Sequence, residues 1–79
     1  MQIRCYPVQS PEDMKSCLEI RHKVFVEEQH VPANLEIDGM DAAARHFAVQ
    51  ADGDIIATCR VRLMGSAAKI ERVAVLKEH

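Results

Sequence analysis

Seventy-nine residues with a formal charge of −2 suit a single small domain, residues 1–79. No run of lysine and arginine is present to neutralise a row of phosphates, so we expect no nucleic-acid partner. No apolar stretch approaches the length of a membrane span, and the N-terminus lacks the pattern of a signal peptide. We therefore expect a cytoplasmic protein with no membrane partner.

Cysteine usage fits the same compartment. Cys5, Cys17 and Cys59 are odd in number and far apart, and no two of them have the spacing of zinc ligands. We predict small core residues in a reducing environment, with no disulfide and no metal site.

The first third of the chain predicts a strand followed by a helix. Residues 3–8 alternate and carry β-forming side chains. Ser10 is expected to cap the helix, because its hydroxyl can accept from a free amide, and Pro11 suits the first position, where no amide is needed. Apolar residues then recur at helical spacing until Pro32, which ends the helix or bends the chain.

The remainder predicts a sheet. An acidic, irregular segment, residues 31–44, is expected to contain a short second helix or a turn. Three strands are predicted after it, over residues 46–51, 54–64 and 68–76, with hairpin turns at Asp52-Gly53 and Gly65-Ser66. The fold class is therefore α+β, in the order β-α-(α)-β-β-β, with a four-stranded, mostly antiparallel sheet packed on one or two helices.

Three patterns give finer expectations for the last strands. The odd positions of the long strand predict its core face: Ile55, Ala57, Cys59, Val61 and Leu63. A hairpin centred on Gly65-Ser66 pairs Arg60 with Glu71. The apolar run of residues 73–76 is typical of a strand that is buried on both faces.

Four stretches, taken in order, resemble the GNAT superfamily of N-acetyltransferases. They are IRHKVFVEEQHVP (20–32), EID (36–38), HFAVQADGDIIATCRVR (46–62) and KIERVAVLKEH (69–79). The resemblance is closest to small bacterial acetyltransferases with an R..VFV.EQ.VP signature, and it extends over essentially the whole chain. It implies the N-terminal half of a GNAT fold, truncated before the loop that holds the cofactor pyrophosphate, so the chain alone is expected to have little activity.

The resemblance also implies a reaction and a set of residues. Acetyl-CoA would give its acetyl group to a primary amine by direct attack. The backbone N–H groups of Val73, Ala74 and Val75 are the implied donors to the thioester carbonyl, Val75 above all, although these residues would also serve as core. Glu71 is the candidate general base or water-holder, with a pKa raised in a partly closed cleft. Its alternative is a structural pair with Arg60.

Two further acids, Glu28 and Asp38, are implied on the acceptor side, where an acidic lining would attract a cationic amine. Their alternative is simple solvent exposure. A second function of a different class is a non-catalytic half-domain that forms a homodimer through its exposed last strand, because open strand edges are templates for pairing.

Overall fold

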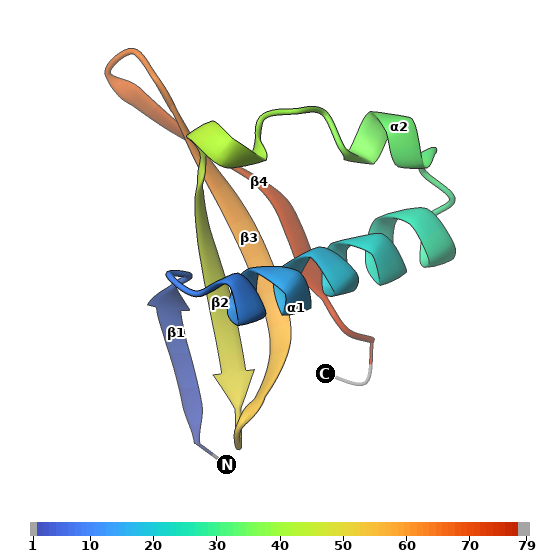
Figure 1. Cartoon of the computed structure of the whole chain (residues 1–79), viewed down its shortest axis with the longest axis vertical. Coiled ribbons are helices and arrows are strands. Elements are labelled where there is room, and N and C mark those ends of the chain that lie inside the picture. Colours follow the sequence, from blue (N-terminus) through green and yellow to red (C-terminus); the bar gives the residue numbers. More distant parts are fainter. Residues whose placement is uncertain (1, 78–79) are drawn as a thin grey trace.

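The computed structural model describes residues 2–77 as one antiparallel sheet with helices on one of its faces (Figure 1). The elements are β1 (Ile3–Pro7), α1 (Pro11–Arg21), the π-helix η1 (His22–Glu28), α2 (Ala33–Glu36), the 3-10 helix η2 (Asp41–Ala43), β2 (Arg45–Ala51), β3 (Asp54–Met64) and β4 (Ala67–Val75). The strands lie in the order β1-β2-β3-β4. The predicted α+β fold is confirmed, and the strand boundaries differ by no more than one residue from those predicted.

The start of α1 follows from its first residues. The Ser10 hydroxyl accepts a hydrogen bond from the Asp13 amide at 3.1 Å, as predicted, and Pro11 occupies the first helical position. Further along, the Gln29 amide donates to the Val24 carbonyl, five residues back, at 3.1 Å. The helix therefore widens into η1 without ending, and it carries the chain across the sheet toward β4.

The core lies between this helix and the sheet. Ile20 and Val24 pack on Ala74 of β4, and Phe25, Ile55 and Leu76 flank them. The Ala74 side chain is small, which lets the helix approach the sheet closely.

The predicted core face of β3 is wrong from Thr58 onward. Val49 pairs with Ala57 but Gln50 pairs with Ile55, so Ile56 is an extra residue that reverses the alternation. Thr58 and Arg60 therefore face the helix side, where Arg60 is completely buried. Beyond the bulge the alternating pattern separates the two faces of β3 correctly but assigns the helix to the wrong one.

The other face of the sheet is apolar and, in the described residues, uncovered by helix. Ile70 pairs with Val61, and Leu63 and Ile70 are 75% and 67% exposed. The prediction that residues 73–76 are buried on both faces is also wrong. Ala74 is buried under the helix, but its neighbours Val73 and Val75 are exposed, because all the described helices lie on the side of Ala74.

The Ser10 cap gives a direct test of this local structure. Replacing the hydroxyl (Ser10→Ala) leaves an amide of the first turn without its acceptor and should lower the free energy of unfolding by about 1 kcal/mol. Urea denaturation followed by circular dichroism measures this. Ser66→Ala in the exposed β3–β4 turn is the control and should change little; equal losses in both variants would contradict the capping role.

Candidate functional site

Arginines and acids gather where the chain between α2 and β2 crosses the sheet. We call residues 33–44 the strap. The arginine–carboxylate cluster consists of Arg21, Arg60, Arg62 and Arg72 with Glu36, Asp38, Asp41 and Glu71. Its four positive and four negative charges cancel. The acids come from the strap and β4, and the arginines come from α1, β3 and β4.

Arg60 is the centre of the cluster. Its two terminal nitrogens each donate to a different oxygen of Asp38 at 2.8 Å, and one of them also donates to Asp41 at 3.0 Å. The guanidinium reaches Glu71 at 2.8 Å through the other. Hydrogen bonding to Asp38 raises the pKa of Arg60 above its ordinary value despite burial. A fully buried arginine is tolerated here because its planar fork is matched by carboxylates.

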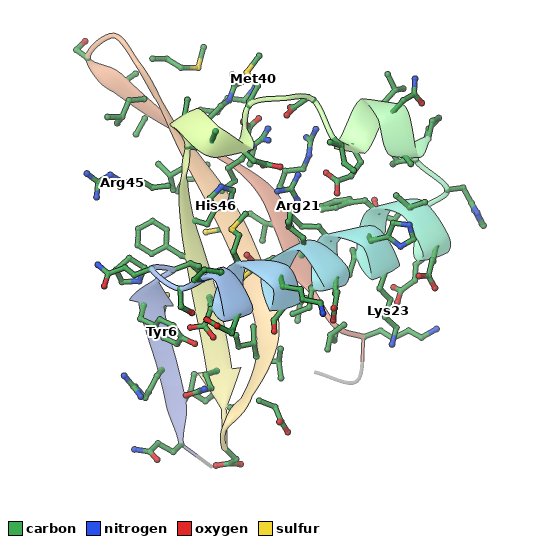
Figure 2. The ribbon with its side chains drawn as sticks, viewed as in Figure 1. Tyr6, Arg21, Lys23, Met40, Arg45 and His46 are labelled. Atoms are coloured by element: carbon green, nitrogen blue, oxygen red, sulfur yellow. The ribbon has the colours of Figure 1, made fainter. Side chains whose placement is uncertain are left out.

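Arg21 ties α1 into the same cluster. It donates to Asp41 at 2.7 Å and to Glu36 at 2.5 Å, and Figure 2 shows its side chain rising from the helix toward the strap. Burial favours the neutral form of Asp41, but hydrogen bonds from Arg21 and Arg60 outweigh burial and lower the pKa of Asp41. The Asp41 carbonyl lies 2.9 Å from His46 Nε2. Its bonds to Asp41 and Glu36 give Arg21 a structural role, because they join α1 to the strap.

Glu71 is held by arginines rather than left open in a cleft. The predicted pairing with Arg60 is confirmed in the register of β3 and β4, and Arg62 Nε also donates to Glu71. Lys69 Nζ lies 3.7 Å from its other oxygen. Desolvation would raise the pKa of Glu71, but the hydrogen bonds from Arg60 and Arg62 lower it, opposite to the expected direction. The carboxylate is therefore ionised at neutral pH and suits holding water better than accepting a proton itself.

Arg72 joins β4 to the strap. It donates to the carbonyls of Leu35 and Glu36 at 3.2 and 3.1 Å and to a carboxylate oxygen of Asp38 at 3.2 Å. Its backbone φ is +54°, which is uncommon outside glycine. The sequence analysis did not identify Arg72. The high density of arginines and acids in the chain was the available signal, and it does not indicate which of them pair.

The predicted donors on β4 have a definite orientation. The Leu76 amide donates to the Ile56 carbonyl of β3 at 3.0 Å. Because successive amides of a strand point to opposite sides, the Val75 amide points away from β3. Val73 lies where the pairing of β3 and β4 shifts register, so the alternation does not fix the direction of its amide. Within the described residues β4 is an outer strand, so the Val75 amide lies on an open edge. The Ala74 amide faces β3.

The two acids implied on the acceptor side differ in their surroundings. Asp38 is held by Arg60 and Arg72, and hydrogen bonding to Arg60 brings the pKa of Asp38 far below its usual range. Glu28 ends η1, and its Oε2 is buried without a hydrogen-bond partner in the described part of the chain. Of the two, Glu28 has the free acceptor atom.

A groove of about 590 Å³ lies between α1 and the strap, next to the arginine–carboxylate cluster, and Glu36 and Asp41 of the cluster form part of its lining. Its lining is mainly apolar and includes Met14, Leu18 and Ile37. Neither Glu28 nor Glu71 lines it, and the residues of β4 do not either. The candidate donors of β4 and the candidate acids Glu28, Asp38 and Glu71 therefore lie outside this groove.

Across residues 2–77 no helix is long and apolar enough to cross a membrane. Nor do the side chains of that range form a group of three or more histidines, cysteines or acids able to hold a metal ion. Cys17 is buried, as expected of a core residue, but Cys5 is exposed. The prediction of three core cysteines is thus wrong for Cys5, which lies on the outer strand β1.

Comparisons with known proteins place the fold in a family. No family profile matches the chain. The Bacillus subtilis protein YjcF, named an uncharacterized N-acetyltransferase, is 37% identical over 68 residues, which is 86% of this chain and 49% of YjcF. The solved structure of Escherichia coli ElaA matches 99% of this chain and 58% of its own, with a TM-score of 0.82 and 25% identity. The chain is a half-length match to the GNAT N-acetyltransferases.

A third solved structure is similar over the same range. An acyl-CoA N-acyltransferase from Pseudomonas aeruginosa matches 98% of the chain and 56% of its own, with a TM-score of 0.80 and 25% identity. The chain spans about half the length of the curated relatives that it matches.

The ion pairs predict how stability depends on pH. Asp38, Asp41 and Glu71 have pKa values below the ordinary 3.8 or 4.5 when folded. Their contribution is therefore fully present above those ordinary values, and it is lost as the pH falls from them through the lowered pKa values of the folded chain. Asp38→Asn should lower stability at neutral pH and flatten the decline between about pH 5 and 2, measured by urea denaturation at each pH.

Asp54→Asn is the matched control, since Asp54 is exposed in the β2–β3 hairpin at the other end of the sheet. Its curve should follow that of the unsubstituted chain. A decline for Asp38→Asn that runs parallel to the unsubstituted chain would show that Asp38 does not contribute.

Proposed function

We propose that this chain is part of an acetyl-CoA-dependent N-acetyltransferase that acts on a primary amine by direct attack. The observation that carries the proposal is the outward amide of Val75 on the open edge of β4, in a chain related to acetyltransferases. An N–H fixed by a strand and free of any ladder partner is suited to donate to a carbonyl oxygen that gains negative charge. Acetyl-CoA would supply an activated acetyl group.

The three residues of this strand segment have different parts in the proposal. Val75 presents its amide to the open edge and is the principal donor, and Val73 is the second proposed donor. Ala74 contacts the cofactor side only through the strand, since its side chain is buried against Ile20 and Val24. Packing of Ala74 fixes the strand from behind, so that the amide of Val75 does not need to reorganise during the reaction.

The acids act on the acceptor amine. The unpartnered oxygen of Glu28 would accept a hydrogen bond from a cationic ammonium, and the negative charge of Asp38 on the strap would favour the approach of a cation. Glu71 would hold the water through which the ammonium loses its proton, since its own pKa is lowered. Because the chain spans about half of its relatives, we expect little turnover by the chain alone.

The donor assignment can be tested by removing one hydrogen. Val75→Pro deletes the outward N–H without breaking a bond to β3, which an outer strand tolerates. In an acetyl-CoA titration followed by amide chemical shifts, the unsubstituted chain should respond around residues 73–76, and Val75→Pro should respond at least tenfold more weakly. Val75→Ala, which keeps the N–H, should behave like the unsubstituted chain. A response unaffected by Val75→Pro would exclude this amide as the donor.

A second candidate function is self-association. It is favoured by the open edge of β4 together with the exposed apolar side chains Ile70 and Val73 on that strand. A second copy of the chain would extend the sheet by pairing with β4 and would cover part of this surface.

Sedimentation velocity over a range of concentrations distinguishes this candidate from a monomer. Pairing through β4 predicts a dimer that Val73→Lys converts to a monomer, because a charge on an edge strand opposes pairing. Leu63→Lys, on the inner strand β3, should leave an edge-paired dimer intact. A chain that stays monomeric at every concentration would rule the candidate out, and dissociation by Leu63→Lys alone would indicate packing through the sheet face.

A further inference from the structure

We propose that Arg72 is a positioning residue that couples the strap to the open edge of β4. The proposal rests on the proposed function only for what the Val75 amide binds. The mechanical part, a link between the strap and the direction of β4, stands on the geometry alone.

Strand β4 has an irregular shape at Arg72. Thr58 pairs with Ala74 and Arg60 pairs with Glu71, so two residues of β4, Arg72 and Val73, lie opposite one residue of β3. This is a β-bulge, which bends its strand and turns the amides that follow. Val75 is three residues beyond Arg72 and pairs with Ala57 after the bulge, so a change in the bend at Arg72 would tilt the segment that carries the Val75 amide.

An arginine is an unusual residue for the backbone conformation at position 72. A φ of +54° is the region in which glycine is favoured and most side chains are strained. The chain nevertheless has an arginine here, and its side chain is only 24% exposed. A residue that is unfavourable for the backbone implies a compensating role for the side chain.

The side chain of Arg72 holds the strap through several hydrogen bonds. Nη2 of Arg72 donates to two successive carbonyls of the strap, those of Leu35 and Glu36, and to Asp38. Nε lies 3.3 Å from both the carbonyl and the carboxylate of Glu36. One guanidinium therefore fixes the strap by its backbone, and any movement of the strap is passed to the bulge from which that guanidinium extends.

The functional consequence links the two sides of the proposed reaction. The strap carries Asp38, on the acceptor side, and β4 carries the amide of Val75, on the cofactor side. A strap held by Arg72 would orient the donor, so that binding of an amine against the strap and alignment of the thioester carbonyl would not be independent.

Arg62 provides a matched comparison. It has the same charge, a 23% exposed side chain and a bond to Glu71 of the same cluster. Its contact with the strap is to the Met40 sulfur, and within the described residues Arg62 makes no hydrogen bond to the strap backbone. Removing Arg62 therefore removes a charge from the cluster without releasing the strap carbonyls.

The test measures amide hydrogen exchange by NMR in the 79-residue chain and in Arg72→Gly, which accepts the positive φ but removes the guanidinium. The amides of Ile37 in the strap and Leu76 beyond the bulge, each with a 3.0 Å acceptor, report on the two coupled parts. The Val8 amide, bonded to His46 at 2.7 Å at the far side of the sheet, reports on the whole fold.

Coupling predicts that Arg72→Gly speeds exchange at both Ile37 and Leu76 by about tenfold and leaves Val8 unchanged. Arg62→Ala should change none of the three by more than about twofold. An unchanged Leu76 amide, or an equal rise at Val8, would overturn the proposal, the first because the parts are not linked and the second because the role is general stability. Arg72→Lys, which keeps the charge but loses the planar fork, should show the same pattern to a smaller degree and applies if Arg72→Gly does not fold.

An acetyl-CoA titration of the same samples separates this inference from the proposed function. No response of Val75 in the unsubstituted chain, with exchange still coupled, would refute the cofactor role and leave the link standing. A Val75 response of equal size in the unsubstituted chain and in Arg72→Gly would refute the positioning role while supporting the cofactor site.

Discussion

The burial of the Arg60 guanidinium is the constraint on which much of this structure depends. A buried charge is tolerated only when its hydrogen bonds are satisfied by opposite charge. The strap supplies Asp38 and Asp41 and β4 supplies Glu71, so two separate elements bring their acids to Arg60. Asp41 then shares its carboxylate with Arg21, and as a result α1, the strap, β3 and β4 meet at one electrically neutral point.

The sequence predicts the local part of this arrangement well. The cap at Ser10 and the turn at Gly65-Ser66 each depend on residues close together, and the turn also fixes the pair Arg60–Glu71. The links from Arg21 and Arg72 to the strap join residues up to 37 positions apart and follow no periodicity. They depend on which face of the sheet the helix covers, which no local pattern contains.

The error in the core face of β3 shows how one residue can mislead. Ile56 has no counterpart in β2, and this single insertion exchanges inside and outside for everything that follows. The odd positions that follow the bulge, from Cys59 to Leu63, share a face that lies opposite the helix, whereas Ile55, before the bulge, packs on the helix side. With the odd positions predicted as core, Arg60 falls on the opposite face, and its charge is buried only through acids that come from elsewhere in the chain. The lowered pKa of Glu71 depends on the same long-range contacts, so the sequence could not predict it.

The side of the sheet that faces the helices is divided into two unlike halves: the apolar packing of Ile20 and Val24 on Ala74, and the arginine–carboxylate cluster at the strap. Apolar packing weakens in the cold, whereas the cost of removing water from charges falls as temperature rises. Acid reaches only the second half. Cooling should therefore loosen the contact of α1 with the sheet first, and acid should release the strap first. The same small chain would begin to unfold in different regions under the two conditions.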